Sequence, residues 1–134
     1  MANILLVDDD PVLLALLGKL LRRLGHAVTA ADGGRAGLAA AREPGGPAFD
    51  LVLTDLRMPD LDGYDLIRAL RTEGATAAAV ILLVSSHLEG PDPELARAAG
   101  ADAWAAKPLH AERLGGLIQR LLAGQPAAAP AEGL

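Results

Sequence analysis

The chain has 134 residues, a formal charge of −5 and an apolar content of 51%. This length suits one domain with a substantial core, which must be aliphatic because Phe, Tyr and Trp occur once each. The acidic balance argues against direct nucleic-acid binding, which usually needs a basic face. The absence of cysteine excludes disulfides and thiol chemistry.

The N-terminus lacks a basic segment followed by an apolar signal core. No apolar run approaches the roughly 18 residues of a membrane span. Together with the missing cysteines, these features predict a cytoplasmic protein without a membrane partner.

Short apolar segments alternate along the chain with longer segments of helical periodicity. Continuous apolar runs bounded by turn residues are typical of strands that are buried on both faces. The predicted strands are Ile4–Val7, Ala27–Ala30, Leu51–Thr54, Val80–Val84 and Ala103–Ala106. The predicted helices are Pro11–Leu24, Gly34–Arg42, Gly63–Glu73, Asp92–Ala99 and Ala111–Leu122.

The first helix has the clearest boundaries. Its leucines recur at helical spacing, Asp10 is suited to cap it, Pro11 suits its first position, and Gly25 follows its end. The last helix contains the pair Gly115-Gly116, and each glycine costs roughly 1 kcal/mol relative to alanine. We therefore expect the last helix to be pliable.

Five strands that alternate with five helices predict an α/β fold, a doubly wound five-stranded parallel sheet with helices on both faces. Such sheets bind ligands beyond the carboxyl ends of their strands. Residues 1–123 are predicted to form this domain. The Ala/Pro-rich residues 124–134 are predicted to be a tail or the stump of a linker.

Polar side chains stand where the predicted strands end, and the topology brings these ends to one edge. Asp8 and Asp9 follow the first strand, Asp55 the third, Ser85 the fourth and Lys107 the fifth. Clustered carboxylates are suited to Mg²⁺, which would offset their mutual repulsion. A carboxylate beside a lysine and a hydroxyl is suited to forming an aspartyl phosphate.

Four segments in this order carry a family resemblance. Ile4–Asp10, Asp50–Gly63, Val80–Ser85 and Gly100–Pro108 resemble the receiver domain of bacterial two-component response regulators. The resemblance covers roughly residues 2–123 and implies a flavodoxin-like sheet of strand order 2-1-3-4-5.

The resemblance implies a phosphorylation switch and assigns its residues. Asp55 would accept the phosphoryl group, which Ser85 and Lys107 would contact. Asp8, Asp9, Asp55 and the backbone carbonyl of Arg57 would hold Mg²⁺. The implied phosphoryl donors are a histidine kinase, a histidine phosphotransfer protein or a small phosphodonor.

Further implications concern signalling. Trp104 stands at the family's switch aromatic and would move as Ser85 is drawn to the phosphoryl group. Arg57, Ser86 and His87 would tune reaction rates, and Pro108 would follow a cis peptide bond. A downstream protein or effector would read the surface of the fourth helix, fifth strand and fifth helix, through which the resemblance also suggests a homodimer.

Plainer interpretations remain open for individual residues. The three consecutive acids from Asp8 to Asp10 also suit a solvated turn with a helix cap. Asp60 and Asp62 suit the turn before Gly63, and Trp104 suits plain core packing as well as switching. The three histidines have no metal-ligand spacing.

Two rival functions also remain. Asp8-x-Asp10 after an apolar strand superficially resembles haloacid-dehalogenase-type phosphatases, although no later acidic pair follows the lysine. A receiver-like protein-binding module that never carries phosphate is the second rival. In the favoured interpretation the chain is no enzyme, because it catalyses only its own phosphorylation and dephosphorylation.

Overall fold

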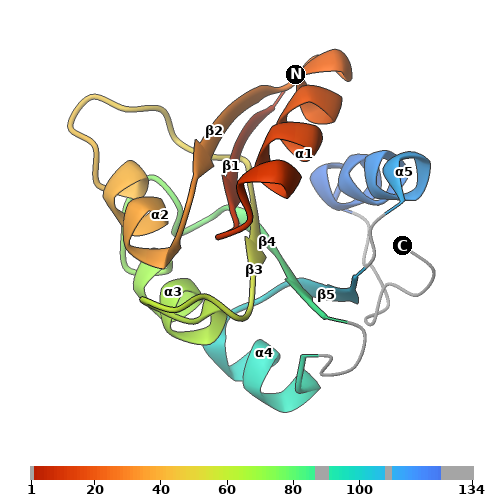
Figure 1. Ribbon diagram of the computed structural model, residues 1–134. Coiled ribbons are helices and arrows are strands. Elements are labelled where there is room, and N and C mark those ends of the chain that lie inside the picture. Colours follow the sequence, from red (N-terminus) through yellow and green to blue (C-terminus); the bar gives the residue numbers. More distant parts are fainter. Residues whose placement is uncertain (1, 87–90, 108–109, 125–134) are drawn as a thin grey trace.

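The computed structural model describes residues 2–86, 91–107 and 110–124, in which five strands alternate with five helices (Figure 1). The strands are β1 (Asn3–Val7), β2 (Ala27–Ala31), β3 (Leu51–Asp55), β4 (Val80–Ser85) and β5 (Ala103–Ala106). The helices are α1 (Pro11–Arg23), α2 (Gly34–Ala41), α3 (Gly63–Leu70), α4 (Pro93–Ala99) and α5 (Ala111–Leu122).

The sheet is fully parallel and has the order β2-β1-β3-β4-β5, which confirms the predicted fold. Helices α1 and α5 cover one face, and α2, α3 and α4 cover the other (Figure 1). Alternate residues along a strand pack into two separate hydrophobic cores, one on each face of the sheet. Ile4 and Leu6 pack toward α1 and α5, whereas Leu5 and Val7 pack toward the other three helices.

Strand β2 departs from the expectation that every strand is buried on both faces. Ala27, Thr29 and Ala30 are exposed, and only Ala31 is buried. The reason is its edge position, since β2 pairs with β1 alone. Its short side chains also cover little of either core.

Helix α3 ends at Leu70, three residues before the predicted end at Glu73. Two hydroxyls compete for its last carbonyls. The Thr72 hydroxyl donates to the Ala69 carbonyl at 2.7 Å, and the buried Thr76 hydroxyl donates to the Leu70 carbonyl at 2.5 Å. The same two carbonyls also accept the backbone N–H groups of Thr72 and Glu73 at 3.0 and 3.1 Å, so tighter i to i+3 bonds and the hydroxyl bonds together end the α-helix.

Helix α1 begins at Pro11 as predicted and ends at Arg23, one residue before the predicted end at Leu24. The Asp10 carboxylate accepts the backbone N–H groups of Val12 and Leu13 at 3.0 and 3.4 Å, and Gly25 has the positive φ of 93° that ends the helix. Helix α5 runs unbroken through Gly115 and Gly116. No helix in the described ranges is long and apolar enough to cross a membrane.

Candidate functional site

Three carboxylates meet at the carboxyl ends of β1 and β3. Asp8 and Asp9 follow β1, and Asp55 is the last residue of β3. One oxygen of each lies within 4.8 Å of one oxygen of the others. Asp8 and Asp55 are 2% and 6% exposed, whereas Asp9 is exposed to solvent. The parallel topology therefore builds the acidic cluster that the sequence predicted.

Lys107 joins this cluster from the end of β5. Its Nζ lies 3.3 Å from Asp55 Oδ1, as expected, and 3.0 Å from Asp8 Oδ2, which the sequence analysis did not anticipate. The second Asp8 oxygen accepts the backbone N–H of Asp10 at 2.9 Å. The Lys107 backbone N–H donates to the Ser85 carbonyl at 2.7 Å, which fixes the start of the loop after β5.

The cluster has a surplus of negative charge, because three carboxylates face one ammonium. Burial raises the pKa of Asp55, the nearby Asp8 charge raises it further, and Lys107 opposes both. Burial alone would lower the pKa of Lys107, but its hydrogen bond to Asp8 and the two carboxylate charges outweigh burial and raise it. Hard oxygen donors with surplus negative charge fit Mg²⁺ well.

Ser85 is the last residue of β4, and the Asp55 backbone pairs in register with its neighbour Val84. The Ser85 hydroxyl is fully buried and has no hydrogen-bond partner in the described structure. A buried hydroxyl without a partner costs about 1–3 kcal/mol. A phosphoryl oxygen arriving at this edge would satisfy it, so the donor set fits that group too. Ser86 is exposed next to it.

The loop between β3 and α3 begins directly after Asp55. Arg57 is exposed on this loop, two residues past Asp55. At the base of the loop, the Gly63 N–H donates to the Leu56 carbonyl at 2.8 Å. A Cβ at Gly63 would lie 2.7 Å from the Asp55 carbonyl oxygen, so glycine is required here. Asp62 caps α3 through the Asp65 N–H, as expected for the turn before Gly63.

Asp60 makes a contact that the sequence did not predict. Besides interacting with the backbone of its own turn at Asp60 and Leu61, its carboxylate accepts the N–H groups of Gly34 and Arg35 at 3.1 and 3.0 Å. Gly33, the N-cap residue of α2, has no side chain with which to bind these groups. A helix that begins at Gly-Gly has no capping side chain of its own, and this feature of the sequence indicates that a residue elsewhere in the chain caps it.

Trp104 lies in the core between the sheet and helices α3 and α4, and its side chain is 4% exposed. The guanidinium carbon of Arg97 lies 5.6 Å from the ring centroid, within range of a cation–π contact. The indole Nε1 has no hydrogen-bond partner in the described residues. Core packing is thus observed, and switching stays a prediction.

Two predicted site residues, His87 and Pro108, lie outside the described residues, as do residues 125–134 of the predicted tail. The roles assigned to His87, Pro108 and the tail therefore stay predictions.

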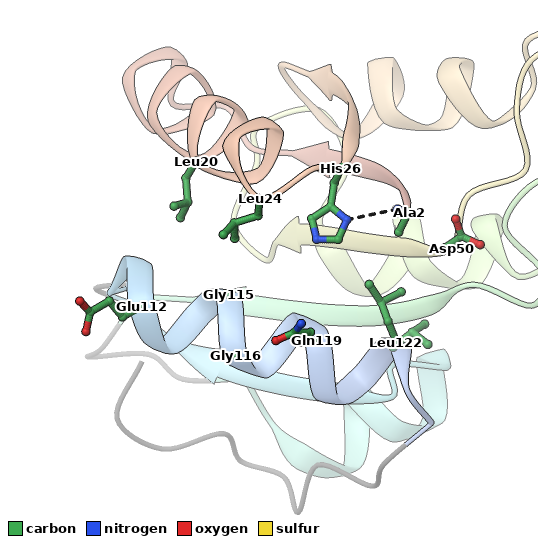
Figure 2. Close-up of a pocket in the computed structure, with 11 residues that line it drawn as sticks. Ala2, Leu20, Leu24, His26, Asp50, Glu112, Gly115, Gly116, Gln119 and Leu122 are labelled. Atoms are coloured by element: carbon green, nitrogen blue, oxygen red, sulfur yellow. Dashed lines mark hydrogen bonds between the residues drawn. The ribbon is translucent and has the colours of Figure 1, made fainter.

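A hollow of about 900 Å³ lies away from the acidic cluster, between the C-terminal half of α1 and helix α5 (Figure 2). Leu20 and Leu24 point from α1 toward Gly115 and Gly116 of α5. None of the predicted site residues lines this hollow, so the hollow is separate from the predicted magnesium and phosphoryl site.

The family model described as "Response regulator receiver domain" matches residues 4–119. The chain therefore belongs to the response regulator receiver family. This family acts in phosphorylation-dependent two-component signalling and binds Mg²⁺ in an acidic pocket.

Three similar proteins illustrate the relationship. Protein PilH of Pseudomonas aeruginosa is 35% identical over 124 residues, which are 92% of this chain and all of PilH. The gliding motility regulatory protein of Myxococcus xanthus is 38% identical over 120 residues, 89% of this chain but only 15% of that protein. The receiver domain of the Pseudomonas aeruginosa sensor histidine kinase PA1611, described with a magnesium ion in its active-site cleft, is 31% identical with a TM-score of 0.77. That match covers 91% of this chain and 98% of the other.

Proposed function

We propose that the chain is a phosphorylation-activated switch of a two-component system and that Asp55 is its phosphoryl acceptor. One observation carries the proposal. The buried Asp55 carboxylate lies 3.3 Å from the Lys107 ammonium, within the cluster that also contains Asp8 and Asp9. The unpartnered Ser85 hydroxyl ends the neighbouring strand.

In this proposal a carboxylate oxygen of Asp55 attacks the phosphorus of a phosphohistidine on a histidine kinase or histidine phosphotransfer protein. The new O–P bond forms as the P–N bond breaks, and the departing imidazole nitrogen takes the electron pair. Lys107 favours the ionised form of Asp55 and stabilises charge on the phosphoryl oxygens. Ser85 donates a hydrogen bond to one of these oxygens.

Asp8, Asp9, Asp55 and the Arg57 backbone carbonyl would hold Mg²⁺ in this site. The three carboxylate oxygens within 4.8 Å and the magnesium ion described for the PA1611 receiver support this assignment. When bound, Mg²⁺ neutralises negative charge on the carboxylates and the phosphoryl group.

The output is proposed to be a changed α4–β5–α5 surface. Phosphorylation replaces the single negative charge of the Asp55 carboxylate with the roughly two charges of the phosphoryl group and gives Ser85 an acceptor. Ser85 pairs with Ala106 of β5, the strand that also carries Trp104. A downstream protein or effector domain would read this surface, and a homodimer would form through it. Arg57, Ser86 and His87 would tune the rates.

The chemistry is proposed to be limited to the chain's own phosphorylation and dephosphorylation. In the rival phosphatase interpretation, Asp10 would act as acid and base. The Asp10 carboxylate instead accepts the Val12 and Leu13 N–H groups at the start of α1. This engagement argues against an aspartate-nucleophile phosphatase.

The decisive experiment is intact mass spectrometry after incubation with acetyl phosphate, with and without Mg²⁺. We expect one Mg²⁺-dependent phosphoryl addition that is absent from Asp55→Asn and present in Asp65→Asn, an exposed acid of α3. If neither acetyl phosphate nor a phosphorylated histidine phosphotransfer protein modifies the folded chain, the non-phosphorylated binding module is the better interpretation.

Trp104 is the single tryptophan, so its fluorescence reports on β5 alone. Under phosphorylating conditions we expect its emission to change in the wild type and in Asp65→Asn but not in Asp55→Asn. A constant emission from a fully phosphorylated chain would argue against movement at Trp104.

A further inference from the structure

The loop after Asp55, residues 56–62, is attached to a distant part of the fold. The Asp60 carboxylate binds the first N–H groups of α2, with Oδ1 at 3.1 Å from the Gly34 nitrogen and Oδ2 at 3.0 Å from the Arg35 nitrogen. These two donors belong to the first turn of α2, where backbone N–H groups have no partner within the helix. The loop therefore supplies the cap that α2 lacks.

The backbones of the loop and α2 also fit closely. A Cβ at Gly34 would lie 2.6 Å from the Leu61 carbonyl oxygen and 2.7 Å from the Leu61 Cβ. Only glycine permits this approach, and it brings the Asp60 carboxylate to the start of α2. The hydrogen bond from the Arg35 N–H, together with that from Gly34, lowers the pKa of the exposed Asp60, so the carboxylate is ionised at neutral pH.

The two ends of the loop are thus fixed separately. Its base is closed by the bond from the Gly63 N–H to the Leu56 carbonyl, next to Asp55. Its tip is attached to α2 by Asp60. Arg57 stands between these points, so its backbone orientation depends on both of them.

We propose that Asp60 is a positioning residue for the Mg²⁺ and phosphoryl site, which it orients by anchoring the β3–α3 loop to the N-terminus of α2. The inference rests on the proposed function, in which the Arg57 carbonyl is a metal ligand. Asp60 is not among the residues proposed to bind the metal or the phosphoryl group, and its carboxylate binds α2 instead. Groups that orient metal ligands commonly change metal affinity by 10-fold or more when they are removed.

The test compares two aspartates that make the same kind of contact. Asp92 caps α4 by accepting the Glu94 and Leu95 N–H groups of its own helix at 2.9 and 3.3 Å. Asp60→Ala and Asp92→Ala each remove a carboxylate that accepts two helix N–H groups. Mg²⁺ affinity is measured by calorimetric titration in about 0.5 M KCl, where long-range charge effects are screened.

We expect Asp60→Ala to bind Mg²⁺ about tenfold more weakly than the wild type. Asp92→Ala should stay within about twofold, because the Asp92 carboxylate caps its own helix and not one that the loop joins. Wild-type affinity in Asp60→Ala would overturn the proposal. An equal loss in both variants would also overturn it, because general loss of helix capping would then explain the result.

Hydrogen–deuterium exchange of the metal-free proteins gives a second readout. We expect faster exchange at residues 56–62 in Asp60→Ala and unchanged exchange there in Asp92→Ala. If Asp60→Ala fails to fold, Asp60→Asn replaces it, because one amide oxygen can still accept one N–H, and its affinity should be intermediate.

Metal binding by the wild type and exchange in the variant test the metal site and the loop anchor separately. A wild-type chain that binds no Mg²⁺ would contradict the proposed metal site itself. In that case unchanged exchange in Asp60→Ala would show in addition that Asp60 does not anchor the loop.

Discussion

Lys107 and Asp8 form an ion pair of 3.0 Å in which the Asp8 side chain is 3% exposed and the Lys107 side chain 25% exposed. The same ammonium lies 3.3 Å from Asp55. A carboxylate this deeply buried is unfavourable unless a cation or hydrogen-bond donors compensate its charge. Lys107 thus supports the fold as well as the proposed chemistry.

Lys107→Met should therefore destabilise the metal-free protein. We expect the free energy of unfolding in EDTA to fall by about 3 kcal/mol, the usual scale for leaving one partner of a buried pair uncompensated. In saturating Mg²⁺ the loss should be smaller, because the cation would compensate Asp8. Urea unfolding under both conditions measures the difference.

Lys19→Met is the matched control for this variant, because Lys19 is the other lysine of the chain and is exposed on α1. It should change stability by less than about 0.5 kcal/mol in either condition. An equal loss for Lys107→Met with and without Mg²⁺ would contradict a metal site beside Asp8.

Asp55→Asn should stabilise the metal-free protein at neutral pH. The pKa of Asp55 is raised above 3.8 in the folded chain, by burial first and then by the Asp8 charge. The folded state therefore binds this proton more tightly than the unfolded state, and stability falls as pH rises from 3.8 through the folded pKa. At pH 7 the ionised Asp55 carboxylate lowers the free energy of unfolding, and a neutral Asn side chain does not have this effect.

The expected gain in unfolding free energy is on the order of 1 kcal/mol at pH 7 in EDTA. It should shrink as the pH falls and disappear below about 3.8, where Asp55 is protonated in both states. Thermal unfolding across this pH range measures it. A gain that is independent of pH would show that ionisation of Asp55 is not its cause.

The site was predictable where it depends on the chain's topology. Asp8, Asp55 and Lys107 each follow a short apolar run, and parallel strands bring their carboxyl ends to one edge. Once the runs are identified as strands, the cluster follows without knowledge of any particular contact. Ser85 was predictable at this edge for the same reason, because it ends β4, and its hydroxyl lies buried there.

Contacts between surface segments were not predictable in this way. Asp60 and Gly34 are 26 residues apart, and their hydrogen bond depends on how closely the β3–α3 loop approaches α2. Hydrophobic periodicity carries no information on that approach. The early end of α3 was missed for a related reason, because Thr72 and Thr76 act through hydrogen bonds rather than burial pattern.

Arg71 is a structural residue that the sequence analysis also missed. At the amino ends of β4 and β5, its guanidinium donates to the carbonyls of Ala79 and Gly100 at 2.6 Å each and to the Asp102 carboxylate at 2.8 Å. Asp102 also accepts the Ile81 N–H at 2.8 Å. One side chain thus connects the ends of α3 and α4 to the start of both strands.

Arg71→Met should lower the free energy of unfolding by about 2–4 kcal/mol, because several partly buried acceptors lose their donor. Arg71→Lys should recover less than half of this loss, since one ammonium cannot reproduce the planar fork. Arg68→Met, which removes an exposed pair with Asp65, should cost less than about 1 kcal/mol. If urea unfolding gives similar losses of unfolding free energy for Arg71→Met and Arg68→Met, the proposed structural role of Arg71 is contradicted.

Two glycines of α5, Gly115 and Gly116, line the hollow beside α1 (Figure 2). A Cβ at Gly116 would meet only the Arg120 side chain, at 3.7 Å. A Cβ at Gly115 would lie 3.1 Å from Cδ1 of Leu24, the flexible end of a half-exposed side chain. Gly116→Ala should therefore stabilise the protein by about 1 kcal/mol, the difference in helix propensity.

Gly115→Ala should give a smaller gain, because Leu24 must shift to admit the methyl group. Thermal unfolding of both variants measures the difference, and Leu24→Ala combined with Gly115→Ala supplies the control. Relative to Leu24→Ala alone, the second substitution should recover the full propensity gain, since the close contact is then gone. If Gly115→Ala is as favourable as Gly116→Ala in the wild-type background, the approach of Leu24 does not constrain α5.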